Sequence, residues 1–475
     1  MSDLAEKKEG EIVQASWEKY IYPGAELFGG IYKAYFSTYI NLLAATVYVF
    51  SAQIVWVMEL LEAGIQWIGA PVMGAVYDRF SFKNGKFWPW WIILGAGTGI
   101  VYLIFFSIPA FVPNPASFAV LGAILVAVGA FCASGSASLG VAQMMYMGKD
   151  EKVRSWMGMT SKFARDGMKM VVGFIFPVAL IAFNKRMPET QSYALFTTLL
   201  VVVAVAGFIW IAALTKKSSI ERYVLQSKLE SRKKRPLINT IKAIFTNRAM
   251  LVMFLAMTAS KMAFFWHIMG GAFFWRFYMG NFGMFAMWNL FIGLGAMFGV
   301  LLLPAFRKMF KDTKSAYLAA FALQGLCYLI SIFVVSPSNP VGTIAIITAA
   351  LFFNSIPDGL ILPMFGIAAE YTALKSGERD YGLAMSIYSL SIRVGSVGGL
   401  SIRMALLMAA GFNTGRLAAG EAAPEAVMSV FKNYMTLWPC LLVAFIILIV
   451  AFLNPLNDAK AIQLRKDFDE KWGKK

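Results

Sequence analysis

The sequence is short of charged residues and of metal-binding residues. Only 15% of its 475 residues are Asp, Glu, Lys or Arg, whereas soluble domains contain about 25%. There are one histidine and three cysteines. Cys132, Cys327 and Cys440 lie far apart, without the spacing of a zinc site or a disulfide framework. Phosphate-binding loops and nucleophile elbows are also missing. These absences exclude a soluble globular protein, and we expect no metal, no cofactor and no enzyme activity.

Long apolar runs take the place of the missing charge. Hydrophobic residues make up 59% of the chain, and the mean hydropathy is +0.64. Many runs have the roughly 20 residues that a helix needs to cross a bilayer. They lie near residues 20–43, 48–77, 89–111, 116–146, 156–183, 191–214, 249–277, 282–306, 315–336, 341–372, 381–410 and 428–453. The pattern predicts an all-α polytopic membrane protein with about 12 transmembrane helices.

Basic residues are distributed unevenly between the loops. The chain has 43 Lys and Arg against 26 Asp and Glu, a formal charge of +17. About thirty of the basic residues fall in both termini and alternate loops, and about three on the opposite side. Because cytoplasmic loops carry such an excess, we expect both termini in the cytoplasm and the chain in the cytoplasmic (inner) membrane. The charge indicates orientation and contact with membrane lipid, and no nucleic-acid partner is expected.

A basic segment divides the apolar runs into two groups of six. We expect an N-terminal six-helix bundle over 1–214 and a cytoplasmic basic linker over 215–248. A C-terminal six-helix bundle over 249–453 and a cytoplasmic tail over 454–475 follow. Two bundles joined by a loop are typical of secondary transporters, in which a site near the bilayer midplane is exposed to each side in turn.

Two motifs after the second apolar run carry a family resemblance. Asp78-Arg79 ends a GAVYDR stretch that resembles the cytoplasmic loop motif of the major facilitator superfamily. The GKFWPW run at 85–90 resembles the glycoside-pentoside-hexuronide cation symporters, the family of the melibiose permease. Segments 149–154 and 370–393 agree with that family in order and spacing. The resemblance implies a divergent member with the major facilitator fold, two pseudo-symmetric bundles and sugar transport by alternating access.

Charged residues at the cytoplasmic ends of the helices are candidates for gating. Both signs of charge are present, so ion pairs between them could hold one conformation closed. The candidates are Asp78, Arg79, Lys86, Arg154, Glu370 and Arg379. The alternative is that each is an ordinary solvated charge, worth at most about 1 kcal/mol.

Charges inside the apolar runs are candidates for solute binding, because an unpaired charge in hydrocarbon is costly. The resemblance places Lys162 and Arg393 where the family has basic side chains at its sugar site. Ser389 lies one turn before Arg393, and Asp358 falls near a substrate-facing position of the family. The substrate-binding candidates are Lys162, Arg393, Asp358, Ser389, Gln66 and Glu26. Arg403 lies farther along and is expected to reach the membrane interface.

The second apolar run departs from the family pattern. Sodium-coupled members have two aspartates there, one turn apart, and Gln66 and Ala70 stand at those positions, so sodium coupling is not expected. Glu62 lies one turn before Gln66, and Glu59 lies a further turn before Glu62. A buried carboxylate can bind and release a proton. The coupling candidates are therefore Glu62, Asp166 and Glu59. An ion pair, for example with Lys33, is the alternative for Glu62.

The family's sugar-binding aspartates are also replaced, by about Gly29 and Ala137, while the basic residues remain. This favours an anionic solute. We expect a secondary active transporter that moves a glycoside, a uronide or an acidic oligosaccharide, by symport with protons. An uncoupled uniporter, a carrier of lipid or amphipathic organic anions, and a non-transporting receptor or scaffold are the alternatives. The small-molecule substrate and membrane lipid are the expected partners, and no obligate protein partner is evident.

Overall fold

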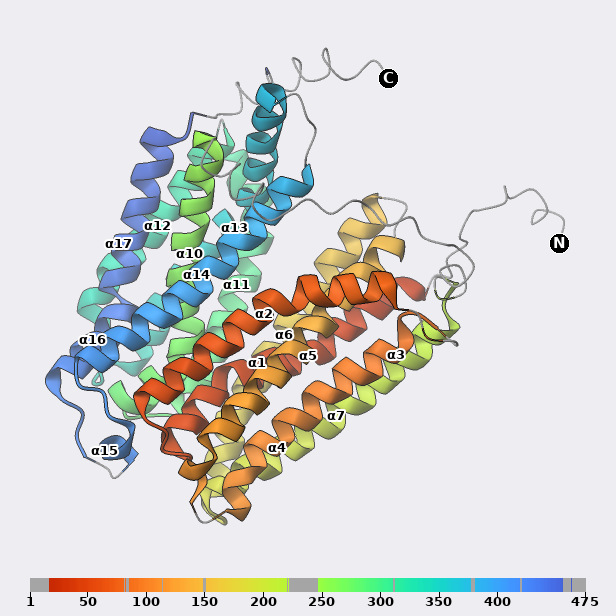
Figure 1. Cartoon of the computed structure of the whole chain (residues 1–475). Helices are drawn as coiled ribbons and strands as arrows, with labels where there is room; N and C mark the ends of the chain where they lie inside the picture. The colour runs from red at the N-terminus through yellow and green to blue at the C-terminus, as the bar shows by residue number, and fades with distance from the viewer. Residues whose placement is uncertain are drawn as a thin grey trace. The chain divides into compact units, whose positions relative to one another are not determined.

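The protein is helical throughout its described parts. The computed structural model describes residues 17–80, 82, 85–112, 114–147, 151–219, 221, 247–310, 312–376, 381–418, 421–455 and 463. Within these ranges the named elements are helices, and one antiparallel bridge joins Phe82 to Gly85. The long helices of each part run alongside one another (Figure 1). The all-α prediction is confirmed.

In the N-terminal half, α1 packs on four of the other helices, α4, α5, α6 and α7. The helices of this half are α1 (Ile21–Thr46), α2 (Ala52–Arg79), α3 (Trp88–Trp90), α4 (Gly97–Phe111), α5 (Ala119–Met147), α6 (Glu151–Asn184) and α7 (Glu189–Lys217). A π-helical turn, Trp91–Ala96, joins α3 to α4, so that they form one span. α1 packs along α6, and α4 packs on α5 and α7.

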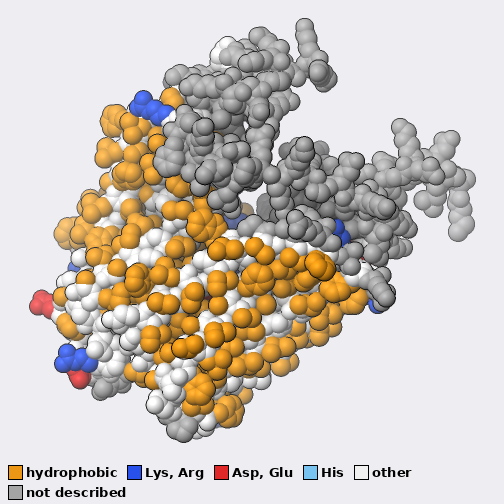
Figure 2. All heavy atoms as spheres, viewed as in Figure 1, with side chains coloured by type: hydrophobic (Ala, Val, Ile, Leu, Met, Phe, Trp, Pro, Cys, Tyr) orange, Lys and Arg blue, Asp and Glu red, His pale blue; other side chains and the backbone are white. Residues whose placement is uncertain are grey.

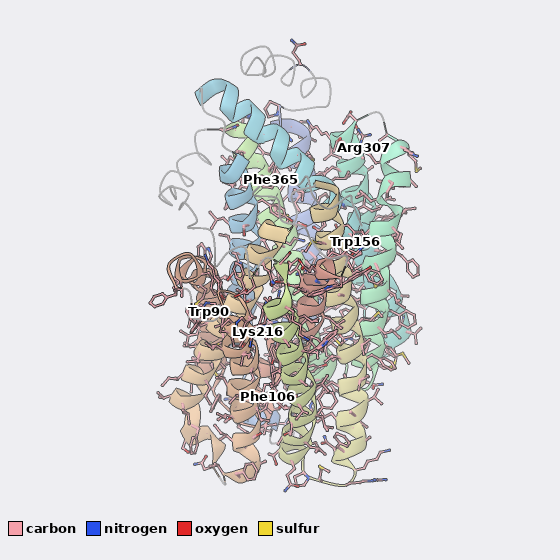
Figure 3. All side chains as sticks on the ribbon, turned by 90° about the vertical axis from the view of Figure 1, so that its right-hand side faces the viewer. Trp90, Phe106, Trp156, Lys216, Arg307 and Phe365 are labelled. Atoms are coloured by element: carbon pink, nitrogen blue, oxygen red, sulfur yellow. The ribbon has the colours of Figure 1, made fainter. Side chains whose placement is uncertain are left out.

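Aromatic side chains fill the interior between these helices. The ring of Tyr35 on α1 lies 4.9 Å from that of Phe106 on α4 and 4.8 Å from that of Phe176 on α6. Figure 3 shows Phe106 among these helices. The Tyr35 hydroxyl lies 2.8 Å from Oγ1 of Thr197 on α7, so its polar end has a partner. Such rings hold four helices together through large buried surfaces and favourable ring geometry.

The C-terminal helices begin after the linker. They are α10 (Arg248–Phe273), α11 (Met284–Lys308), α12 (Thr313–Val334), α13 (Pro340–Ser376), α14 (Tyr381–Ala409), α15 (Thr414–Ala418), α16 (Glu425–Met435) and α17 (Leu437–Leu448). α10 packs on α14, and α13 packs on α11 and α12. Asn247 caps α10 by accepting from the Ala249 and Met250 amides, and Asp312 caps α12 by accepting from the Ser315 amide. Both are preferred N-cap residues, so the sequence starts these helices locally.

The chain forms two compact units. One comprises Met1–Tyr48 and Leu61–Lys233, and the other comprises Val49–Leu60 and Lys234–Lys475. The beginning of α2 therefore packs with the C-terminal helices, although the sequence analysis assigns it to the N-terminal bundle. Phe50 shows one reason, because its carbonyl accepts a hydrogen bond from the hydroxyl of Thr414.

The surface of the helices is apolar. Large side chains such as Phe111, Phe333 and Leu301 are 82%, 82% and 69% exposed. On the face shown in Figure 2, hydrophobic side chains spread over the helices. Within the described residues, ten helices are long and apolar enough to cross a membrane, and they coincide with the third to twelfth predicted runs. The first two predicted runs coincide with α1 and α2. Length and surface composition together fit a multi-pass membrane protein.

Candidate functional site

A cluster of four charged side chains lies between α1 and α6 in the N-terminal unit. Nη1 of Arg165 is 3.1 Å from Oε2 of Glu26, which joins the two helices. Oδ1 of Asp166 lies 3.5 Å from both Nε of Arg165 and Nζ of Lys169. The Glu26 side chain is only 8% exposed. The two carboxylates and two cations balance, so each charge has a partner that lowers its cost in the membrane.

Lys162 lies beside this cluster without joining its ion pairs. It is exposed, and it acts on Asp166 only as a nearby positive charge. The ion pairs of Asp166, a predicted coupling residue, are to Arg165 and Lys169. The sequence analysis gives no role to Arg165. The available signal was the position of Arg165 next to Asp166, in a helix that must pair its charges.

Two polar side chains in the middle of α2 contact each other. Nε2 of Gln66 donates to Oε1 of Glu62 over 3.2 Å, and Glu62 is 5% exposed. Glu62 makes further interactions as well. The side chain of Ala70, at the second departure from the family pattern, lies outside the described residues.

Glu59, nearer the start of α2, pairs with Arg403 of α14 within the C-terminal unit. Both side chains are 1% exposed. The expectation that Arg403 reaches the membrane interface is therefore wrong, because a carboxylate inside the protein holds its guanidinium. Within the described structure, Oε2 of Glu59 and Nε and Nη1 of Arg403 have no hydrogen-bond partner. The guanidinium also lies 5.7 Å from the centre of the Phe273 ring, which partly compensates.

A second, partly buried ion pair joins α10 to α13. Nζ of Lys261 is 2.5 Å from Oδ2 of Asp358, the predicted substrate-facing carboxylate. One turn earlier on α13, Oδ1 of Asn354 accepts from Ser260 over 3.4 Å and from Gln324 over 3.2 Å. These contacts form a polar layer across three helices. In this conformation Asp358 is neutralised by Lys261, whose role sequence reasoning missed.

Arg393 differs from these paired cations. It is half-buried on α14, and among the described residues no acidic side chain pairs with it. α14 approaches α10 closely here, since a Cβ on Gly395 would lie 2.5 Å from the Thr258 carbonyl. Ser389, one turn before Arg393, is exposed. The unit therefore holds a cation within a membrane span, with an exposed hydroxyl one turn away.

The GKFWPW segment is held by a residue that sequence reasoning missed. The Glu221 carboxylate accepts from the backbone amides of Lys86 and Phe87, the latter over 3.1 Å. Burial raises the pKa of Glu221, and the amides that donate to it oppose the shift. Nζ of Lys216 lies 5.1 Å from the centre of the Trp88 ring. Figure 3 labels Lys216 together with Trp90 of the same segment.

Of the predicted gating residues, Lys86 has a described side chain. The side chains of Asp78, Arg79, Arg154, Glu370 and Arg379 lie outside the described residues. Lys86 itself is 7% exposed. Among the described residues, no group of three or more His, Cys, Asp or Glu could hold a metal ion.

Comparison with known proteins gives one family match and several structural matches. A family model described as "MFS/sugar transport protein" matches residues 22–458. The "Uncharacterized symporter YjmB" of Bacillus subtilis (strain 168) is 24% identical over 241 residues. That match spans 50% of each chain, so this chain covers half the length of that relative.

The solved structures share the fold at low sequence identity. The nucleoside transporter NupG gives a TM-score of 0.61 at 11% identity, over 92% of this chain and 100% of that one. A D-xylose-proton symporter gives a TM-score of 0.61 at 10% sequence identity, over 92% of this chain and 97% of that one. Tetrameric PepTSo2 gives a TM-score of 0.62 at 13% identity, over 93% of this chain and 98% of that one.

Proposed function

Because the chain belongs to the family of MFS/sugar transport proteins, and is thus a multi-pass membrane transporter of small molecules, we propose that it carries an anionic sugar derivative. The solute is a glycoside, a uronide or an acidic oligosaccharide. It moves by alternating access, in symport with protons. The chain lies in the cytoplasmic membrane with both termini inside, as the distribution of basic residues favours.

The observation that carries the proposal is the cation of Arg393, which has no acidic partner among the described residues. An uncompensated charge in a membrane span is costly and marks a binding site or an ion pathway. The other basic residues of the described clusters, Arg165, Lys169, Lys261 and Arg403, each have a carboxylate. A solute carboxylate would supply what Arg393 lacks, through the paired hydrogen bonds that a guanidinium offers. Lys162, in the N-terminal unit, is an exposed cation beside the ion pairs of α6.

Two features support proton coupling over sodium coupling. Gln66 stands where sodium-coupled relatives have an aspartate, and sodium prefers several hard oxygen ligands. The neighbouring Glu62 is a buried carboxylate that can take up and release a proton during a transport cycle. Glu62 is the foremost candidate for the residue that binds the coupled proton, and Asp166 and Glu59 are the next candidates.

The substrate class can be tested by exchange in liposomes without an ion gradient. Matched pairs of solutes, such as a glucoside and the corresponding glucuronide, separate the effect of the carboxylate. We expect exchange of the acidic member, loss of that exchange in Arg393→Ala, and partial recovery in Arg393→Lys. Arg416→Ala is the control, because Arg416 is 68% exposed and pairs with the exposed Glu421. Equal exchange of both solutes, unaffected by Arg393→Ala, would overturn the anionic-substrate proposal.

A further inference from the structure

His267, the single histidine of the chain, lies inside α10 with two acceptors around its ring. It is 0% exposed. Nδ1 is 2.8 Å from the Ala263 carbonyl, and Nε2 is 3.0 Å from the Met435 carbonyl. A carbonyl oxygen only accepts hydrogen bonds, and a neutral imidazole has one N–H to donate. A neutral ring can therefore satisfy one of the two contacts, whereas the imidazolium donates to both.

The sequence around Met435 explains why its carbonyl is available. α16 ends at Met435, and Thr436 leaves the helical conformation with φ −129° and ψ −77° before α17 begins. The residue four positions after Met435 is Pro439, which has no N–H to donate. The Met435 carbonyl is thus an orphan acceptor at a helix break, and Nε2 of His267 meets it.

The surroundings of the ring supply aromatic and polar contacts but no carboxylate partner among the described residues. The His267 ring stacks on that of Tyr328 with centroids 5.3 Å apart, a position that favours a cation over the aromatic face. The Tyr328 hydroxyl accepts from Gln324 over 3.4 Å. Burial opposes a charge on the imidazole, and the two carbonyls and the aromatic face offset part of that cost.

The titratable and charged groups nearest the ring come from each neighbouring helix. One turn along α10, the Tyr434 hydroxyl donates to the Gly270 carbonyl over 3.0 Å, and Nη1 of Arg403 lies beside the same glycine. Glu59 neutralises Arg403. Among the described residues, these groups are Tyr328 and Cys327 from α12, Tyr434 from α16, Arg403 from α14, Glu59 from α2 and Cys440 from α17. The Lys261–Asp358 pair lies farther along α10.

We propose that His267 is a proton-binding site, and that its second proton ties α10 to the break between α16 and α17. In this conformation the ring holds both protons and donates to both carbonyls. When the carbonyl of Met435 moves away, one acceptor is lost and the ring releases one proton to water. This role rests on the proposed proton coupling. It adds His267 as a proton-binding residue beside the carboxylates proposed for coupling.

Nitrogen NMR of protein labelled with ¹⁵N-histidine tests the proton site without any transport. A single histidine gives a single pair of ring signals, so the protonation state is read directly. We expect both ring nitrogens to carry protons at neutral pH. A ring that stays neutral between about pH 5 and 8, the range of ordinary histidine titration, would overturn the proposal.

Pro439→Ala tests whether the missing N–H of Pro439 is what leaves the Met435 carbonyl available to His267. It gives residue 439 an N–H that competes for the Met435 carbonyl, so we expect the His267 signal to change to that of a neutral ring with one proton. Pro304→Ala is the control, because Pro304 also lies inside a spanning helix, α11, and it should leave the signal unchanged. An unchanged signal in Pro439→Ala would contradict the role of the orphan carbonyl.

Transport by His267→Gln tests the coupling role. Glutamine can still donate to the Met435 carbonyl but cannot carry a second proton. We expect solute exchange without a gradient to persist, and accumulation driven by a proton gradient to be lost. Undiminished accumulation would overturn the coupling role. If the wild type accumulates no solute with protons, the proposed function fails, while the NMR experiment still decides the protonation of His267.

Discussion

Glu59 and Arg403 form an ion pair with both side chains almost completely buried. Within the described structure, three of the pair's polar atoms lack hydrogen-bond partners. Taking two charges out of water is expensive, and incomplete hydrogen bonding leaves part of that cost uncompensated. The pair is therefore sensitive to the loss of either member, in a way that depends on which charge remains.

Removing Glu59 should be worse than removing Arg403. Glu59→Gln leaves a guanidinium that cannot lose its proton, so we expect a loss of about 3–5 kcal/mol of stability. Arg403→Met leaves a carboxylate that can take up a proton, so we expect a smaller loss. Thermal unfolding of the purified variants measures the order, and the double variant should recover part of the loss. Equal effects of the two single variants would contradict this explanation.

Glu221 should make stability depend on pH. Its folded pKa is raised above the ordinary value of 4.5, because burial disfavours the carboxylate. A raised pKa means that the folded state binds the proton more tightly than the unfolded chain. Its contribution to stability is therefore fully present below pH 4.5 and is lost as pH rises through the raised value.

Melting curves across this acidic range check the prediction. Glu221→Gln should flatten the part of the pH dependence that this group causes, because the amide does not titrate. Glu421→Gln, which changes an exposed carboxylate, serves as the matched control. A Glu221→Gln profile that parallels the wild type would show that this carboxyl does not contribute.

At the scale of elements, the contact between α1 and α6 depends on Gly30. A Cβ at this position would lie 2.7 Å from the Arg165 carbonyl, whereas a Cβ on the adjacent Gly29 would meet nothing within 4 Å. Gly30→Val should force the helices apart and cost about 1–3 kcal/mol. Gly29→Val is the matched control and should cost less. Unfolding midpoints compare the two, and equal losses would mean that backbone freedom, not close packing, sets the cost.

The sequence predicts the elements better than their partners. Apolar length alone predicts the described spans, because a bilayer demands about 20 apolar residues in each. It does not predict the break at Thr436, which lies inside one continuous apolar run. Nor does it predict that Glu26 meets Arg165, 139 positions away, or that Glu221 meets the GKFWPW segment, 135 positions from Lys86. A single sequence carries no signal for such distant pairing.

At the scale of the whole molecule, each unit neutralises charges within its helices, but with different side chains. The N-terminal unit balances Glu26 and Asp166 against Arg165 and Lys169. The C-terminal unit balances Lys261 with Asp358 and, among its described residues, leaves Arg393 without a carboxylate. Under the proposed function, Arg393 is the cation of this unit that an anionic solute would neutralise.

The most direct test is accumulation of an acidic sugar by the purified protein in liposomes. Each vesicle preparation receives an inward proton gradient, an inward sodium gradient or none, and internal solute is compared with external solute. Symport with protons predicts accumulation above the external concentration only with the proton gradient. Accumulation that requires sodium would contradict the proposed coupling, and equilibration without accumulation under every gradient would show an uncoupled uniporter.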